Sequence, residues 1–116
     1  MLFRSLKAGD KSVSARALEQ LELAAQWGAT LPEVYANLSF ARLVEGNGVG
    51  ALAAADVGLR LDEKHVPCLF NRAAALNALK QYGTCIDTLD ELLKISPGFL
   101  PAVQSRANTL ERMRKI

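Results

Sequence analysis

The sequence has too little of several residue types to support the functions that depend on them. It contains one histidine, His65, and two cysteines, Cys68 and Cys85, which form neither a CxxC pair nor another metal-ligand spacing. The formal net charge is only +2, from 14 Lys and Arg against 12 Asp and Glu. That charge is too small to direct the whole chain to nucleic acid or anionic lipid. We therefore expect no metal or other cofactor, no nucleic-acid partner, and two reduced thiols in the core.

Long apolar runs are also missing. No segment approaches the roughly 20 apolar residues of a membrane helix, and the N-terminus lacks the continuous apolar core of a secretory signal. Hydrophobic residues make up 50% of the chain and charged residues 22%, a balance typical of a globular domain rather than a disordered tail. The length of 116 residues is the usual size of one domain. We expect a single cytoplasmic domain over residues 1–116, without direct membrane insertion.

The residue constellations of catalysis are missing too. His65 belongs to no recognisable triad, and the glycine-rich stretch 46–50 has neither a strand before it nor a lysine after it, as a phosphate-binding loop would. Asp87, Asp90 and Glu91 are predicted to lie on one solvated helix stretch rather than to form an acid–base pair. We therefore predict that the protein is not an enzyme.

What the sequence does contain is a repeat of 34 residues. Small side chains recur at this period in two sets, namely Ala17, Ala51 and Cys85, and Ser5, Ser39, Ala73 and Ala107. Apolar side chains recur at the same period in Leu18, Leu52 and Ile86, and in Met1, Tyr35, Leu69 and Val103. A period of this length is typical of helix-turn-helix repeats.

Each period contains two helices according to its apolar spacing. Leu89, Leu92 and Leu93 follow Ile86 at helical intervals, whereas the alternation of a strand is not sustained anywhere. Glycine and proline recur between the apolar segments, where they interrupt or begin helices. We expect helices near residues 1–9, 14–27, 33–45, 49–61, 67–80, 84–95 and 101–114.

The repeat resembles the tetratricopeptide repeat (TPR) family. In residues 66–99, the signature residue types of that family stand at Leu69, Asn71, Ala73, Tyr82, Cys85, Leu89, Leu93 and Pro97. In residues 32–65 they stand at Tyr35, Asn37, Leu38, Ser39, Gly46, Ala51, Leu59 and Leu61. The sequence departs from the family pattern at five positions, where Gly58 and Leu92 replace an alanine, Arg42 an aromatic residue, Arg72 a leucine and Glu63 a proline.

The resemblance implies an all-α fold, a right-handed superhelical array of antiparallel helix pairs (an α-solenoid). About three repeats, near residues 1–31, 32–65 and 66–99, would be followed by a C-terminal capping helix near residues 100–116. Within each pair, Ser39 or Ala73 on the first helix is expected to face Ala51 or Cys85 on the second, because only small side chains permit such close contact.

Arrays of this kind bind ligands on a concave face formed mostly by the first helix of each repeat. Continuing the helical register places apolar and amide side chains there, and we predict partner binding by Phe3, Leu6, Asn37, Phe40, Phe70, Asn71, Asn77 and Asn108. Asn37 and Asn71 would stand about 10 Å apart, the spacing of packed helices. The resemblance implies that such asparagines hold the main chain of a bound peptide. Alternatively, the asparagines bond neighbouring helices, and Phe40 and Phe70 pack into the core.

Two functional classes fit these sequence features. The first is a non-catalytic adaptor, chaperone or assembly factor that binds a peptide segment of another protein in the groove. The second is a structural or assembly subunit of a larger complex, held through its flanks or end helices, and a homo-oligomer is compatible with either class. Another mode of the family clamps a terminal carboxylate with basic residues. Glu33, Pro67 and Pro101 stand where those bases would be wanted, which argues against a heat-shock co-chaperone.

Overall fold

The computed structural model describes residues 15–115, and helices account for most of them. The first described helix covers residues 15–26, and the others are α2 (Pro32–Val44), α3 (Gly48–Leu61), α4 (Val66–Ala78), α5 (Tyr82–Ile95) and α6 (Leu100–Arg114). The expected bounds of these helices agree with the observed ones to within two residues. The helix predicted near residues 1–9 lies outside the described residues.

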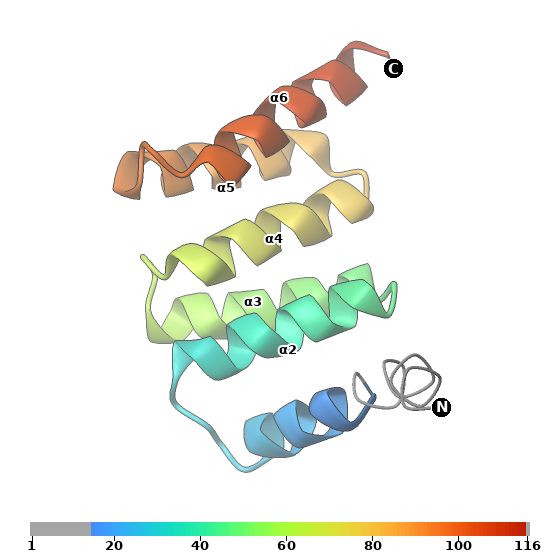
Figure 1. Ribbon diagram of the computed structural model, residues 1–116, viewed down its shortest axis with the longest axis vertical. Helices are drawn as coiled ribbons and strands as arrows, with labels where there is room; N and C mark the ends of the chain where they lie inside the picture. The colour runs from blue at the N-terminus through green and yellow to red at the C-terminus, as the bar shows by residue number, and fades with distance from the viewer. Residues whose placement is uncertain (1–14, 116) are drawn as a thin grey trace, which may run out of the picture.

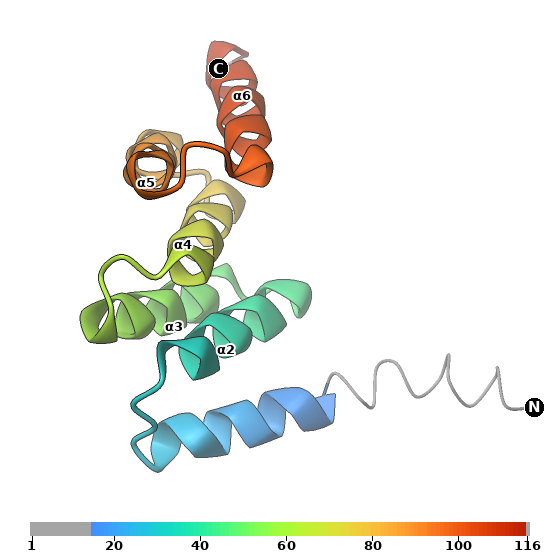
Figure 2. The same cartoon turned by 60° about the vertical axis from the view of Figure 1, so that its left-hand side comes forward.

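The helices pack as antiparallel pairs that stack along the long axis of the molecule (Figures 1 and 2). Helix α2 packs on α3, α4 packs on α5, and α6 follows against α5. Helices α2 and α4 also contact each other directly, so the first helices of successive pairs form one side of the array. The predicted all-α fold of stacked helix pairs is confirmed.

Proline and backbone turns define where the helices begin and end. Pro32, Pro67 and Pro101 lie in the first turns of α2, α4 and α6, where the missing amide hydrogen costs little. Two residues after the end of α2, Gly46 has φ of +78°, and two residues after the end of α4, Lys80 has the same left-handed conformation with φ of +62°. The same hydrogen-bond pattern closes both turns, Asn47 N to Arg42 O at 2.8 Å in one and Gln81 N to Leu76 O at 2.8 Å in the other.

Small side chains bring the paired helices together as predicted. Ser39 Oγ donates to the carbonyl oxygen of Ala51 at 2.8 Å, and Cys85 Sγ donates to that of Ala73 at 3.2 Å. All four residues are fully buried. The same two positions of the repeat therefore meet in both pairs, with the donor on the first helix in one pair and on the second helix in the other.

Both cysteines are free and buried, as predicted. Burial, together with the carboxylates of Glu33 and Asp62, raises the pKa of the Cys68 thiol to about 11. Burial also raises the pKa of the Cys85 thiol. Gly58 lies so close to Cys68 that a Cβ added to this glycine would stand 2.4 Å from the cysteine Sγ. Gly58, where the family has alanine, therefore sets how closely α3 approaches α4.

Ion pairs connect each pair of helices to the next. Arg72 Nε donates to Asp56 Oδ1 at 2.9 Å between α4 and α3, and Arg106 Nε donates to Asp90 Oδ1 at 2.7 Å between α6 and α5. Asp90, predicted to lie on a solvated stretch of helix, has a side chain that is 45% exposed and also pairs with the guanidinium group of Arg106.

Candidate protein-binding surface

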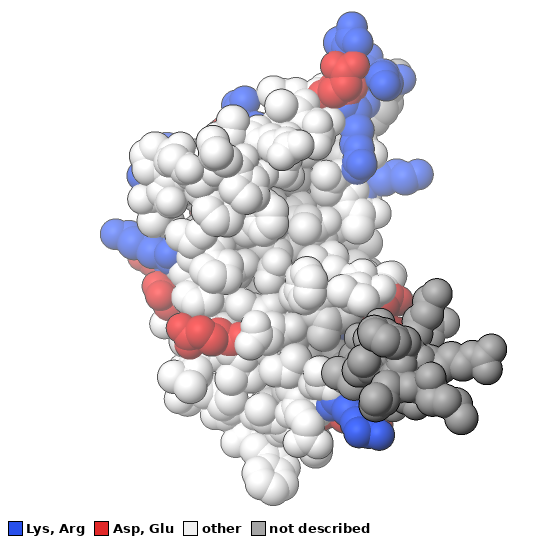
Figure 3. All heavy atoms as spheres, in the orientation of Figure 1, with Lys and Arg blue, Asp and Glu red and all other residues white. Residues whose placement is uncertain are grey.

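The first helices α2, α4 and α6 share one face of the molecule. In the view of Figure 3, Lys, Arg, Asp and Glu side chains gather around the margins of this face, and its middle is nearly free of charge. An uncharged surface of this kind favours ligands with apolar and neutral polar groups, because a charged ligand would lose hydration there without gaining a counter-charge. This face is where the sequence places the predicted partner-binding residues.

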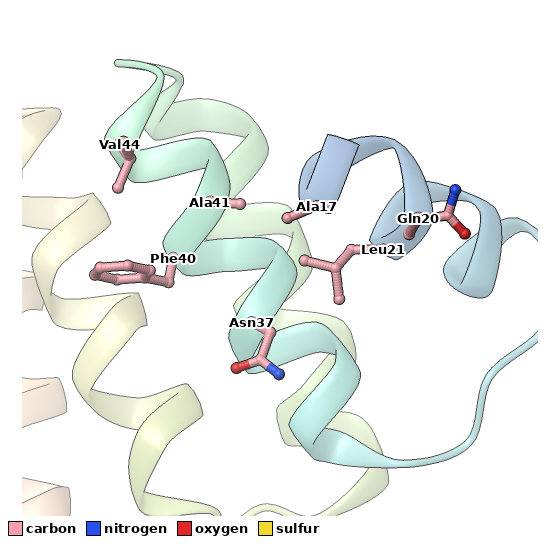
Figure 4. Close-up of a pocket in the computed structure, with 7 residues that line it drawn as sticks. All are labelled: Ala17, Gln20, Leu21, Asn37, Phe40, Ala41 and Val44. Atoms are coloured by element: carbon pink, nitrogen blue, oxygen red, sulfur yellow. The ribbon is translucent and has the colours of Figure 1, made fainter. Parts of the chain in front are cut away.

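A pocket opens at the α2 end of this face, between α2 and the helix over residues 15–26 (Figure 4). Its cavity volume is about 530 Å³. The residues that line it carry no charge. They are Ala17, Gln20, Leu21, Asn37, Phe40, Ala41 and Val44. Asn37 and Phe40 come from α2, and in the view of Figure 4 Leu21 points toward α2 from the neighbouring helix, whereas the Phe40 ring extends from the other side of α2. The pocket combines apolar walls with one amide from each helix.

Phe40 and Phe70 differ in what they offer a ligand. Phe40 is 60% exposed on the wall of the pocket. Phe70 is half-buried, packs against the core, and meets Phe99 edge to face with ring centroids 5.5 Å apart. The core-packing alternative therefore describes Phe70, whereas Phe40 remains available as an aromatic anchor.

The two asparagines that are one repeat apart also differ. Asn71 is half-buried, and its Nδ2 donates to the carbonyl oxygen of Ala36 at 2.9 Å, which ties α4 to α2. Asn37 is exposed and lines the pocket. Bonding between neighbouring helices, the alternative left open by the sequence, therefore occupies the donor of Asn71. Asn37 is placed to meet a ligand.

Asn77 and Asn108 are not among the residues that line the pocket. Asn77 Nδ2 donates to Thr109 Oγ1 at 3.4 Å, and Asn77 Oδ1 accepts from Arg112 at 2.6 Å, so Asn77 joins α4 to α6. Asn108 is exposed on α6. Phe3 and Leu6 lie outside the described residues.

The N-terminal ends of the first helices hold no basic side chain. Their second residues are Glu33, Pro67 and Pro101. Glu33 Oε1 lies 3.4 Å from Nε2 of His65, the residue just before α4. A clamp for a terminal carboxylate needs cations, and this end of the surface presents a carboxylate instead.

At the same end of this surface, His65 lies between Glu33 and Cys68 and is close to both. His65 Nδ1 lies 3.1 Å from Cys68 Sγ, and Cys68 Sγ donates to the carbonyl oxygen of Pro32 at 3.6 Å. A cysteine nucleophile must be exposed and ionised. Cys68 is fully buried and its pKa is raised to about 11, so this group connects α4 to α2 and does not provide a nucleophile.

Metal-binding clusters and membrane-spanning helices are both absent from the described part of the chain. Within residues 15–115, no three His, Cys, Asp or Glu side chains are grouped so that they could hold a metal ion. None of the described helices has the length and apolar character needed to cross a membrane.

The sequence matches no protein-family model and no curated protein. Its structure matches solved TPR domains over nearly the whole chain. The first TPR domain of human RPAP3 gives a TM-score of 0.85 at 13% identity, covering 97% of this chain and 88% of that one. The first TPR of Spaghetti (RPAP3), bound to an HSP90 peptide, gives 0.83 at 14% identity, covering 96% and 90%.

A third similar structure is the Sgt2 TPR domain from Aspergillus fumigatus. It gives a TM-score of 0.82 at 12% identity and covers 97% of this chain and 76% of that one. The chain therefore has the TPR fold, as its 34-residue repeat indicated. At these identities the comparisons show the fold alone.

Sequence reasoning missed one wall of the pocket. Ala17, Gln20 and Leu21 lie on the helix over residues 15–26, whereas the predicted binding residues were confined to the first helix of each expected pair. Ala17 nevertheless belonged to a recognised column with Ala51 and Cys85, which are buried, while Ala17 itself is exposed. Ala17 is exposed because it lines the pocket, and only the structure shows this difference in burial.

Proposed function

We propose that this protein is a non-catalytic binding module, an adaptor or chaperone that binds an uncharged, partly apolar peptide segment of another protein on its α2–α4–α6 face. The observation that supports the proposal is the uncharged pocket of about 530 Å³ at the α2 end, with Phe40 60% exposed on its wall. A cavity of this size is suited to an anchoring side chain, and its few polar groups fix orientation. The surrounding face supports the rest of the segment.

The pocket residues suggest a division of roles. Phe40 buries an apolar side chain of the ligand, because an aromatic ring contributes much contact area with little rotamer entropy to lose. Asn37 donates to and accepts from the main chain of the ligand. Asn71 contributes indirectly, because its bond to Ala36 fixes α4 against α2. Asn108 extends the surface along α6.

Two structural neighbours support binding of a protein segment. The Spaghetti domain is bound to the HSP90 peptide SRMEEVD, and the second TPR domain of human RPAP3 is in complex with the HSP70 peptide SGPTIEEVD. Both peptides are acidic, whereas the pocket at Phe40 is uncharged and the first turn of α2 contains the acidic residue Glu33. We therefore propose the same kind of interaction with a different class of peptide.

A random-peptide library selected on the protein would test the proposal, with affinities then measured for single variants. Replacing Phe40→Asp should weaken the selected peptides about tenfold or more, as expected for loss of an interface anchor. Asn37→Ala should weaken them less. The matched control is Val49→Asp, which changes an apolar side chain that is 69% exposed on α3.

The outcome depends on the comparison between these variants. Selected peptides that lose affinity in Phe40→Asp and keep it in Val49→Asp support the groove as the binding site. Equal affinity for the wild type and Phe40→Asp would contradict the proposal. Circular dichroism of each variant checks that the helices are retained.

A second candidate function, a subunit held through an end helix, is favoured by a separate observation. Helix α6 exposes several large apolar side chains, including Leu100 and Val103. In our proposed division of the chain, α6 follows three repeats near residues 1–31, 32–65 and 66–99. Leu100 and Val103 lie outside the pocket, so substitutions there and at Phe40 distinguish the two candidate functions.

A further inference from the structure

Helix α6 has one buried face and one exposed apolar face. Ala102 and Thr109 are fully buried against the preceding helices, and Thr109 Oγ1 lies 3.7 Å from Cys85 Sγ of α5. Leu100, Val103, Ala107 and Leu110 are all exposed. Their spacing of three, four and three residues places them along one side of the helix. Val103, Ala107 and Leu110 together form the α6 outer face.

The outer face corresponds to a buried surface one repeat earlier. Thirty-four residues before its members stand Leu69, Ala73 and Leu76 of α4, with exposures of only 2%, 0% and 2%. They are buried because α5 packs across them and bonds Ala73 through Cys85. Val103 and Leu110 are 45% and 42% exposed, and within residues 15–115 no helix covers them.

A terminal capping helix would need a polar outer face to keep the array soluble. The α6 outer face instead has the pattern with which α4 binds its second helix: a branched apolar residue, an alanine four residues later and a leucine three residues after that. Helix α6 is therefore equivalent to the first half of a repeat. The residue pattern by which α4 contacts α5 is thus repeated on α6.

We propose that the α6 outer face binds an amphipathic helix of a partner protein, antiparallel to α6, as α5 binds α4. The expected helix has a small residue opposite Ala107 and large aliphatic residues four and seven positions later. These are the positions that Cys85, Leu89 and Leu92 occupy in α5, where all three are fully buried. A bulky residue opposite Ala107 would hold the two helices apart.

Charge at the end of α6 further defines the partner. Basic side chains outnumber acidic ones at the C-terminal end of α6 (Figure 3), where the sequence places Arg112, Arg114 and Lys115, and where Arg114 pairs with Glu111 at 2.7 Å. An antiparallel helix begins at that end, so acidic residues in its first turns would meet these cations and also its own helix dipole. Helix 15–26 of a second copy is less suitable, because Arg16, directly before its small residue Ala17, would meet the same cations.

The chain itself supplies a probe with the expected small and aliphatic residues, although its first turn contains no acidic residue. A synthetic peptide of residues 81–96, carrying Cys85→Ala to prevent disulfide exchange, should bind the full-length protein saturably. Nuclear magnetic resonance should show the largest amide shifts in residues 100–113. Ala107→Arg should weaken binding at least about tenfold, equivalent to about 1.4 kcal/mol. Leu110→Glu provides a second variant, and Val49→Arg on α3 is the matched control.

Three results would overturn the proposal. One is affinity that Ala107→Arg and Leu110→Glu leave unchanged. Another is a set of shifts confined to α4 and α5, which would mean that the peptide only exchanges with the chain's own α5. The third is concentration-dependent self-association of the wild type in sedimentation velocity that Ala107→Arg abolishes, because the occupant would then be a second copy. None of these results involves the pocket at Phe40, so the proposed function is tested separately.

Discussion

Arg72 and Asp56 form a contact between repeats that recurs one period later. Arg72 Nε donates to Asp56 Oδ1 at 2.9 Å, and Arg106 bonds Asp90 in the same way at 2.7 Å. Each arginine lies on a first helix and each aspartate on the second helix before it, sixteen residues earlier. The guanidinium group of Arg72 also donates to Thr88 Oγ1 of α5. Arg72, where the family has leucine, therefore bridges three helices.

Removal of the Asp56 carboxylate should lower stability modestly. Both side chains are partly exposed, so Asp56→Asn should reduce the free energy of unfolding by about 0.5–1 kcal/mol, and less at high salt. Denaturant unfolding at low and high ionic strength measures this effect. Glu91→Gln on the exposed side of α5 is the control. A loss that is independent of salt would show that the pair acts through packing instead.

Replacing Lys80→Gly should stabilise the protein. Lys80 has φ of +62° at the position where the previous repeat has Gly46, with φ of +78°. A left-handed conformation strains a side chain with a Cβ by roughly 1 kcal/mol, and glycine removes that strain. Thermal unfolding should show a higher midpoint for Lys80→Gly and a lower one for Gly46→Ala. A decrease for Lys80→Gly would mean that the lysine side chain makes contacts worth more than the strain.

Gly58→Ala should destabilise the protein although alanine is the usual family residue. The added Cβ would stand 2.4 Å from Cys68 Sγ and 3.3 Å from Tyr35 Cβ. Overpacking of this kind costs about 1–3 kcal/mol. Combining Gly58→Ala with Cys68→Ala should recover part of the loss, because it removes the closer contact. A double-mutant cycle of unfolding free energies measures the recovery, and simple additivity would contradict this explanation.

Alkaline pH should reduce stability partly through Cys68. Its pKa is raised from 9.0 in the unfolded chain to about 11 in the folded protein, so the folded state holds the thiol proton more tightly. The stabilisation is complete below pH 9 and is lost as the pH rises from 9 towards 11, where the unfolded thiol ionises first. Cys68→Ser should show a shallower fall than the wild type in denaturant titrations across this range. Parallel curves would refute the assignment.

Acidic chaperone tails should bind poorly. The Spaghetti domain binds the peptide SRMEEVD. On this protein that peptide would meet Glu33 in the first turn of α2, and no basic side chain in the first turns of α2, α4 or α6. We expect no saturation up to about 1 mM peptide, a binding free energy weaker than about −4 kcal/mol. Isothermal titration calorimetry measures this. Tight binding would show that another cationic surface holds the tail.

Much of the candidate site could be predicted from the sequence, but the sequence does not show which of the predicted residues are left exposed for a ligand. Helical periodicity placed Asn37 and Asn71 at equivalent positions, because side-chain direction on a helix follows from spacing. It could not show that Asn71 donates to Ala36 while Asn37 faces the pocket. Phe40 and Phe70 differ in the same way, since the position of Phe99, which covers Phe70, depends on the turn before α6.

The sequence by itself determined the all-α fold, the 34-residue repeat, the helix bounds and the small-residue contacts such as Ser39 with Ala51, because these depend on local spacing and side-chain size. Only the tertiary structure decided which equivalent positions are covered. Ala73 and Ala107 are the same residue at the same place in the repeat, yet Ala73 is buried and Ala107 exposed. Burial depends on whether a following helix packs there, and no local pattern in the sequence encodes that neighbour.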